Sequence, residues 1–194
     1  MVWIDCEMTG LDPDRHTLIE IATIITDFDL NIIDRGPDLA IKLSPAKSRT
    51  MDPWSRRTHT ASGLLERCKT EGVAMADAEK KTLAFIKRYC APKTAPLCGN
   101  SVWCDRMFIK LQMPALDEFL HYRTIDVSSF KEVGTRWSVN AIGGAPRKGD
   151  KHRALEDIRE SLAELRHYRD RWLAPQRAPK AAEAKAESKA ETRP

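Results

Sequence analysis

The sequence has no long hydrophobic run, no paired cysteine motif and few aromatic residues. No uninterrupted run of apolar residues exceeds four, whereas a membrane span needs about 20, so we expect a soluble protein without a membrane contact. The stretch from Met1 to Glu7 holds two acids where an export signal has a basic start, and we expect no such signal. The five cysteines lack a C-x-x-C pair, which disfavours structural zinc and indicates a reduced, cytoplasmic setting.

Several common catalytic motifs are also missing. The sequence contains no Walker A motif, no G-x-G-x-x-G and no G-x-S-x-G, and its five histidines show no zinc-binding spacing. These absences disfavour nucleotide cofactors, serine nucleophiles and zinc hydrolases. The net charge is only +4, without the dense basic stripe typical of proteins that track a long phosphate backbone. A nucleic-acid substrate, if there is one, is therefore expected to be short.

The composition that remains is that of one globular domain. Of the 194 residues, 42% are apolar and 31% charged, which permits an ordinary core. Residues 174–194 have no apolar side chain larger than alanine and cannot offset their ordering entropy. We therefore expect a folded domain over residues 1–173 and a disordered tail over 174–194, with a frayed, alanine-rich helix as the alternative for the tail.

The hydrophobic pattern changes from strand-like to helix-like along the chain. Alternating and β-branched residues predict strands first, and helical spacing of apolar residues predicts helices interleaved with further strands. The last helix is the clearest, and Asp150 is a plausible N-cap for it. This order predicts an α/β fold with a mixed sheet flanked by helices. The expected strands cover 2–4, 18–28, 31–43 (with a kink at Gly36-Pro37), 97–100 and 122–126, and the expected helices 75–89, 105–111, 127–137 and 155–172.

Two carboxylates close the first predicted strand. Asp5 and Glu7 are two residues apart, so their side chains leave the same face of a sheet. Ligands gather at the carboxyl ends of strands in α/β folds, and hard divalent cations prefer oxygen ligands. Asp105 follows another strand and opens a helix. Taken singly, these residues have simpler interpretations, namely a solvated strand end for the pair and a helix cap for Asp105.

A histidine and an aspartate lie around the start of the last predicted helix. Asp157 falls between apolar positions of that helix, near the boundary of its buried stripe, where a carboxylate needs a partner. His152 precedes it by five residues, among basic residues, and alone could be a solvated loop histidine. From the loop or first turn, its ring could approach a substrate while Asp157 holds a metal.

Together, Asp5-x-Glu7, Asp105 and His152-x4-Asp157 have the order and spacing of the DEDDh 3′-to-5′ exonucleases. The strings WIDCEMTGLDP, IEIATIITD, RTHTASGL, CGNS, HYRTIDVSS and ALEDIRESLAELRHYR further resemble the oligoribonuclease family, from residue 3 to about 169. This resemblance implies an RNase H-like fold. It also implies two Mg²⁺ or Mn²⁺ ions held by the four carboxylates, with Asp5 as the bridge, and His152 as the acceptor of a proton from the attacking water.

The same resemblance implies a dinucleotide-sized substrate site in a homodimer. By its match to the T-G-L turn of the family, Leu11 would wedge between two bases. Trp54 and Tyr122 would enclose those bases, and Tyr122 and Arg123 would come from the second subunit. The expected products are 5′-mononucleotides from short RNA. Ser101, Arg123 and Ser128 match residues that hold the 5′ phosphate, and His59 matches a position near the 3′ end.

The sequence departs from the family pattern at Val102-Trp103-Cys104, where smaller or amide-bearing residues are expected. Trp103 would then alter substrate fit or pack at the dimer contact. Three alternatives stay open: a DEDDh exonuclease that trims longer DNA or RNA, a nucleic-acid-binding module without catalysis, and an interaction protein that acts through its tail. Trp54 as packing and His59 as a loop residue are the simpler interpretations of those two positions.

Overall fold

The fold is built on one five-stranded sheet. The computed structural model describes residues 1–146, 149 and 152–173. The strand order is β3-β2-β1-β4-β5; β1, β2 and β3 pair antiparallel, and β4 and β5 add to β1 in parallel. The strands are β1 (Val2–Met8), β2 (Leu18–Thr26), β3 (Ile32–Ala40), β4 (Leu97–Gly99) and β5 (Thr124–Asp126). The predicted α/β class with a mixed sheet is confirmed.

The kink expected at Gly36-Pro37 is present in β3. The pairing of β2 with β3 shifts register there, because Ala22 pairs with Asp38 whereas Ile24 already pairs with Arg35. Proline has no amide hydrogen for the ladder, so a bulge in this edge strand tolerates it. The strand then continues to Ala40, three residues short of the predicted end.

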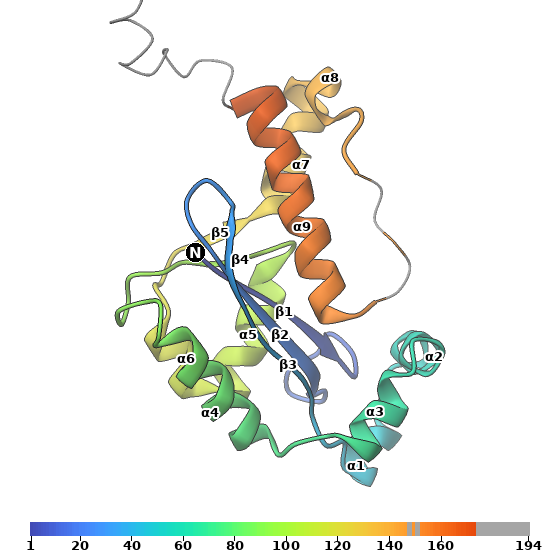
Figure 1. The fold of residues 1–194 in the computed structure, drawn as a ribbon. Helices are drawn as coiled ribbons and strands as arrows, with labels where there is room; N and C mark the ends of the chain where they lie inside the picture. The colour runs from blue at the N-terminus through green and yellow to red at the C-terminus, as the bar shows by residue number, and fades with distance from the viewer. Residues whose placement is uncertain (147–148, 150–151, 174–194) are drawn as a thin grey trace, which may run out of the picture.

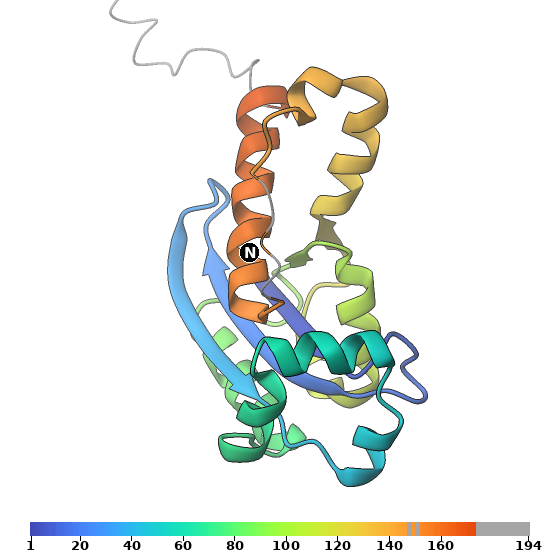
Figure 2. The same ribbon diagram turned by 90° about the vertical axis from the view of Figure 1, so that its right-hand side faces the viewer.

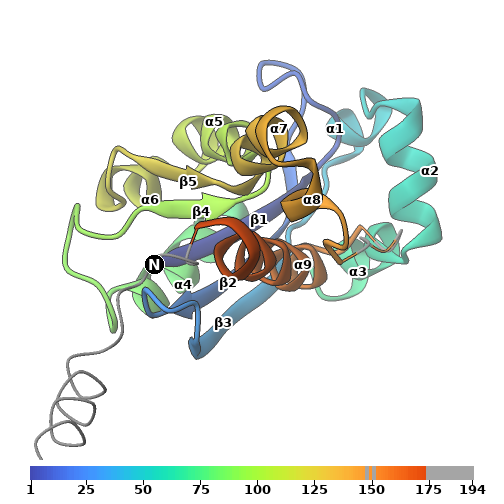
Figure 3. The same ribbon diagram turned by 90° about the horizontal axis from the view of Figure 1, so that it is seen from above.

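Helices cover both faces of the sheet. In Figure 1 the strands run between α9 on one side and α4 and α6 on the other, and the view from above in Figure 3 shows α9 lying across the sheet. The helices are α1 (Pro45–Arg49), α2 (Pro53–Ala61), α3 (Leu64–Thr70), α4 (Met75–Ile86), α5 (Val102–Gln112), α6 (Pro114–Phe119), α7 (Val127–Trp137), α8 (Val139–Ile142), α9 (Ala154–Tyr168) and the π-helical η1 (Arg169–Leu173).

The strands divide the core into two parts. Ile4, Cys6 and Met8 of β1 point to a cluster with α4, α5 and α6. Trp3, on the alternate positions of β1, packs with Ile158 and other apolar residues of α9. Because side chains alternate along a strand, Asp5 and Glu7 share the face of Trp3 and so lie on the α9 side.

The helices between the third and fourth strands differ from expectation. The sequence indicated no element between residues 43 and 75, yet α1, α2 and α3 occupy most of this segment. They are short, and α2 buries only Ser55 and His59, so they lack the apolar periodicity that marks longer helices. Proline at the first turn and the N-caps Ser44 and Asp52 start α1 and α2 instead.

Two helix starts also differ. The helix predicted over 105–111 begins three residues earlier, at Val102, so Asp105 lies in its first turn. Helix α9 begins at Ala154 with Arg153 at the N-cap position, whereas the predicted cap Asp150 and the tail over 174–194 lie outside the described residues. Among the described helices, none has the length and apolar character needed to span a membrane.

Candidate active site

Three residues far apart in the sequence meet where α9 begins. Glu7 of β1, His152 before α9 and Asp157 in its first turns each offer a ligand atom, and these atoms lie within 4.8 Å of one another. Helix α9 packs against β1 and β2, which brings the two carboxylates together. Two carboxylates this close together suit a divalent cation, and the His152 imidazole lies within reach of a water bound there.

Asp105 approaches this region along the edge of β1 that faces away from β2. Strand β4 pairs only with Val2 and Trp3, so the second half of β1 has no strand neighbour on that side. There the backbone N–H of Cys6 donates to Asp105 Oδ1 over 2.9 Å. Asp5, which pairs with Ala22 of β2, and Glu7 are the two neighbours of Cys6 in β1. Asp5, Glu7 and Asp105 therefore all lie beside the Cys6 backbone.

The crowding of carboxylates has a clear electrostatic consequence. Burial, together with the charges of Asp157, Glu20 and Asp105, raises the pKa of Glu7 to about 8. Burial also raises the pKa of Asp105 to about 7, although hydrogen bonds from backbone N–H groups oppose the rise. Cations bound between these groups would relieve both penalties, so the residues fit a site for divalent metal.

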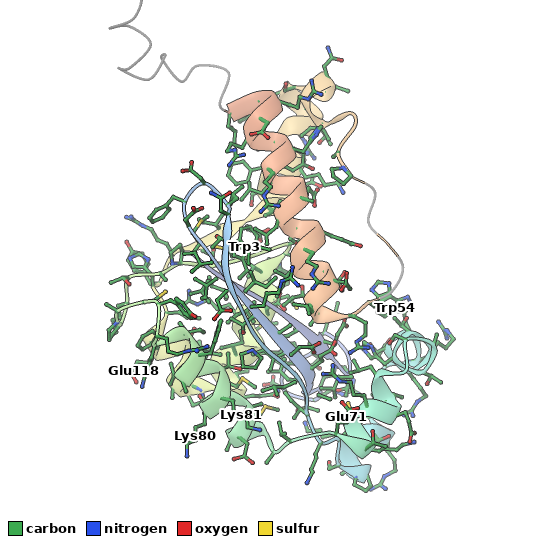
Figure 4. The ribbon with its side chains drawn as sticks, viewed as in Figure 1. Trp3, Trp54, Glu71, Lys80, Lys81 and Glu118 are labelled. Carbon is green, nitrogen blue, oxygen red and sulfur yellow. The ribbon has the colours of Figure 1, made fainter. Side chains whose placement is uncertain are left out.

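His152 is held in an uncommon backbone conformation beside an aromatic ring. Its φ is +44°, a left-handed value that costs a residue with a Cβ roughly 1–2 kcal/mol. The Trp54 and His152 rings meet edge to face with centroids 5.3 Å apart. Figure 4 shows Trp54 on α2 beside the segment that enters α9, and Figure 2 shows α2 next to the N-terminal end of α9.

A pocket of about 480 Å³ adjoins the acidic cluster. It is lined by four residues that the sequence singled out, Glu7, Leu11, Trp54 and His59, together with Met8, Gly10, His16, Asp52 and Ser55. Leu11 and Trp54 are 73% and 52% exposed, which leaves both apolar surfaces accessible. At Gly10, φ is +152° and a Cβ would lie 2.5 Å from the His16 ring, so the turn that presents Leu11 requires glycine.

His59 forms the floor of this pocket. Its Nε2–H donates to the Met8 carbonyl over 2.9 Å, and Nε2 lies 3.8 Å from Glu7 Oε2. Burial lowers the pKa of His59, which favours the uncharged form of the ring. Its buried Nδ1 has no hydrogen-bond partner among the described residues.

Ser101 and Ser128 meet beyond the ends of β4 and β5. Their hydroxyl oxygens are 3.2 Å apart, and the Ser101 N–H donates to both Ser128 Oγ and Asp126 Oδ1. Asp126 also accepts from the Ser128 N–H, as the N-cap of α7. Sequence reasoning missed Asp126 as the organiser of this pair, although an aspartate two residues before Ser128 is a recognisable cap signal.

Tyr122 and Arg123 lie apart from the Leu11 pocket within one chain. They precede β5, are exposed, and stack with the guanidinium carbon 5.2 Å from the Tyr122 ring centroid. Tyr122 lines a different pocket with Arg106 and Asp117. Trp103 is 64% exposed on α5, and two residues along a helix place it about 200° round from Asp105, so it points away from the acids.

The comparisons with known proteins define the class. The family model described as Exonuclease (RNase T) matches residues 2–165. The zinc-bound form of E. coli exonuclease I in complex with single-stranded DNA superimposes with a TM-score of 0.66 at 14% identity, covering 89% of this chain. This chain spans 41% of the length of that structure, and the likeness shows the fold alone. The predicted RNase H-like fold is confirmed, and the family match shows that the chain is a nuclease of the exonuclease class.

Two curated relatives identify the family within this class. The oligoribonuclease of Pseudomonas aeruginosa is 48% identical over 173 residues, which cover 89% of this chain and 96% of that protein. The oligoribonuclease of Corynebacterium diphtheriae is 51% identical over 174 residues, which cover 89% and 83%. The chain belongs to the oligoribonuclease family.

Proposed function

We propose that this protein is a 3′-to-5′ exoribonuclease that degrades very short RNA, dinucleotides especially, to 5′-mononucleotides in the cytoplasm. The observation that carries the proposal is one continuous site, in which the pocket lined by Leu11, Trp54 and His59 shares Glu7 with the cluster of His152 and Asp157. A base-binding pocket next to a cluster of metal ligands suits phosphodiester hydrolysis.

Two divalent cations, Mg²⁺ or Mn²⁺, would be held by Asp5, Glu7, Asp105 and Asp157 and would supply an activated water and stabilisation of the leaving oxygen. His152 takes the proton of the attacking water on its imidazole, a role worth about 10² to 10⁴ in rate. The ring is suited to this role because it stands beside both Glu7 and Asp157 and is held against Trp54.

The substrate is bound by stacking and by phosphate contacts. The exposed faces of Leu11 and Trp54 take two bases in any sequence, because every base has a π-face. Ser101 and Ser128 offer neighbouring hydroxyls for the 5′ phosphate, and Arg123 adds a guanidinium suited to it. His59 lies near the 3′ nucleotide. Because Tyr122 and Arg123 stand apart from the Leu11 pocket in one chain, we assign them to the neighbouring site of a homodimer.

The test is hydrolysis across substrate length. With Mg²⁺ and a 5′-phosphorylated dinucleotide, mononucleotides should appear, and a chelator should stop their release. A 20-mer should be cut much more slowly. A marked preference for the 20-mer would favour an exonuclease that trims longer strands, and the absence of any mononucleotide would favour a module that only binds.

The homodimer has its own test. Sedimentation should give twice the mass of the chain. Mixing an Asp157→Asn variant with an Arg123→Ala variant should then restore part of the activity, since each pair would contain one intact site. A monomeric protein with full activity would overturn the assignment of Tyr122 and Arg123 to a second subunit.

A further inference from the structure

Glu20 lies at the centre of an ion-pair network that the proposed chemistry does not use. Its side chain is 0% exposed, and a buried carboxylate is costly unless it is paired and hydrogen-bonded. Glu20 Oε1 accepts from Arg67 over 2.6 Å and from Arg153 over 2.8 Å. Its other oxygen, Oε2, accepts from the backbone N–H of Ala154 over 3.0 Å. The charge is therefore well compensated.

This network connects the acidic site to the start of α9. Glu20 of β2 pairs directly with Glu7 of β1, so the two side chains leave the same face of the sheet. Arg153, the N-cap residue of α9, makes no capping hydrogen bond with its own side chain. The Glu20 carboxylate supplies from another element the acceptor that a capping side chain normally gives.

The residue next to this ion pair is His152. Its left-handed backbone, with φ +44°, is a conformation that persists only when the surroundings hold it. On one side Trp54 contacts the imidazole. On the other, Arg153 has an extended backbone, with φ −132° and ψ 122°, and its guanidinium is fixed on Glu20 through both Nε and Nη2.

We propose that the Arg153–Glu20 ion pair is the positioning device for His152, holding the imidazole where it takes the proton of the attacking water. This inference rests on the proposed function. Without the Arg153 side chain, the Ala154 N–H still anchors α9 on Glu20. The loss should therefore fall on the position of His152 more than on the helix that carries Asp157.

Arg67 provides a matched control within the same network. It also pairs with Glu20, and in addition it donates to Asp38 and Glu71, so Arg67→Ala should lower the melting temperature at least as much as Arg153→Ala. Turnover should show the opposite order. We expect Arg153→Ala to lower kcat for a dinucleotide tenfold or more, because a small misplacement of a catalytic group can cost about 10²-fold, and Arg67→Ala to stay within about twofold.

Further measurements separate positioning from general loss of structure. KM and the Mn²⁺ affinity from calorimetry should change less than about twofold in Arg153→Ala, because Glu7 and Asp157 remain. Arg153→Lys, which keeps the charge without the planar fork, should recover part of kcat. Glu20→Gln should lower kcat as well, and its effect should not add to that of Arg153→Ala.

The proposal is overturned if kcat in the two arginine variants falls in proportion to their melting temperatures, or if Arg153→Ala keeps the turnover of the unaltered protein. The imidazole NMR signals of His152 give a readout independent of turnover. Their chemical shifts should change in Arg153→Ala and stay unchanged in Arg67→Ala. A protein that cuts no dinucleotide would contradict the proposed function, whereas unmoved His152 signals in Arg153→Ala would contradict the positioning role alone.

Discussion

The two faces of the central sheet are built from different chemistry. The face covered by α4, α5 and α6 is largely apolar, with residues such as Ile4, Ile86 and Leu116 fully buried. The face covered by α9 is apolar only at one end, where Trp3 packs with Ile158. Toward the carboxyl end of β1, the same face carries Glu7 and Glu20 beneath the start of α9.

The apolar face stabilises the fold, whereas the carboxylates on the α9 face serve the site and do not add to stability. Burial of an aliphatic side chain contributes about 1.5–3 kcal/mol to stability. At the acidic end, meaning the region around Glu7 beneath the start of α9, burial and mutual repulsion disfavour the charged forms of the carboxylates. The protein can carry this cluster of carboxylates because the well-packed remainder of the sheet supplies enough stability to offset it. Substitutions at the two regions should therefore have opposite effects on activity and stability.

The largest expected effect is at the acidic end. Asp157→Asn removes one charge from the cluster with Glu7 and His152, so turnover of a dinucleotide with Mg²⁺ should be abolished while the melting temperature in chelator is not lowered. Glu156→Gln, at the neighbouring half-exposed position of α9, should retain turnover. Activity in Asp157→Asn would mean that the metal ligands lie elsewhere.

The apolar face should give the reverse result. Ile86→Ala on α4 removes a fully buried side chain and should destabilise the protein by about 2–5 kcal/mol through lost transfer energy and a residual cavity. The kcat of the folded protein should stay unchanged. Chemical unfolding and turnover at low temperature measure the two quantities, and a large loss of kcat would break the separation between the faces.

Trp54 sharpens the comparison at the substrate pocket. Because the side chain is half exposed, Trp54→Ala should change stability little and weaken dinucleotide binding by about 1–3 kcal/mol, the value of one stacked base. This appears as a rise in KM. Phe28→Ala, an exposed aromatic at the turn between β2 and β3, is the control and should leave KM unchanged. A fall in kcat without a change in KM would show that Trp54 acts only by supporting His152 and does not stack on a base.

The smallest expected effect concerns pH in the absence of metal. Glu7, with its pKa raised from 4.5 to about 8, binds a proton in the folded state that the unfolded chain has released, so stability falls as pH rises between these values. From pH 6.5 to 8.5 the loss is about 2 kcal/mol, because one pKa unit is worth about 1.36 kcal/mol, and Asp105, with its pKa raised to about 7, contributes to it at the acid end of this range.

Thermal unfolding in chelator at pH 6.5 and 8.5 measures this loss. Glu7→Gln should flatten the dependence, and Mn²⁺ should reverse it at pH 8.5. An equal slope in Glu7→Gln would show that the charge of Glu7 is not its source.

The sequence was informative wherever a pattern was local. Alternation and helical spacing gave the five strands and the long helices α4 and α9, and the Gly36-Pro37 pair gave the kink in β3. The candidate site residues came from their order and from family resemblance. That Glu7, His152 and Asp157 approach within 4.8 Å depends on how α9 packs on β1, which no local pattern specifies.

The features that sequence reasoning missed are tertiary. Glu20 lies in a strand whose residues are all buried and would pass for an outward-facing position. Its role becomes visible only when Arg67 and Arg153, which are 86 residues apart in sequence number but both bonded to it, are placed in space. Asp126 is similar, because its contact with Ser101 joins two helix starts across neighbouring strands.

The short length of β4 has one more consequence. A strand with an open edge normally invites another strand, and proteins block such edges to avoid aggregation. Here the Asp105 carboxylate occupies the place that a longer β4 would take, since it accepts the Cys6 N–H. The amide of Cys6 therefore reports on this contact: its hydrogen exchange with solvent should be slow while Asp105 accepts the hydrogen bond and faster when that bond is broken.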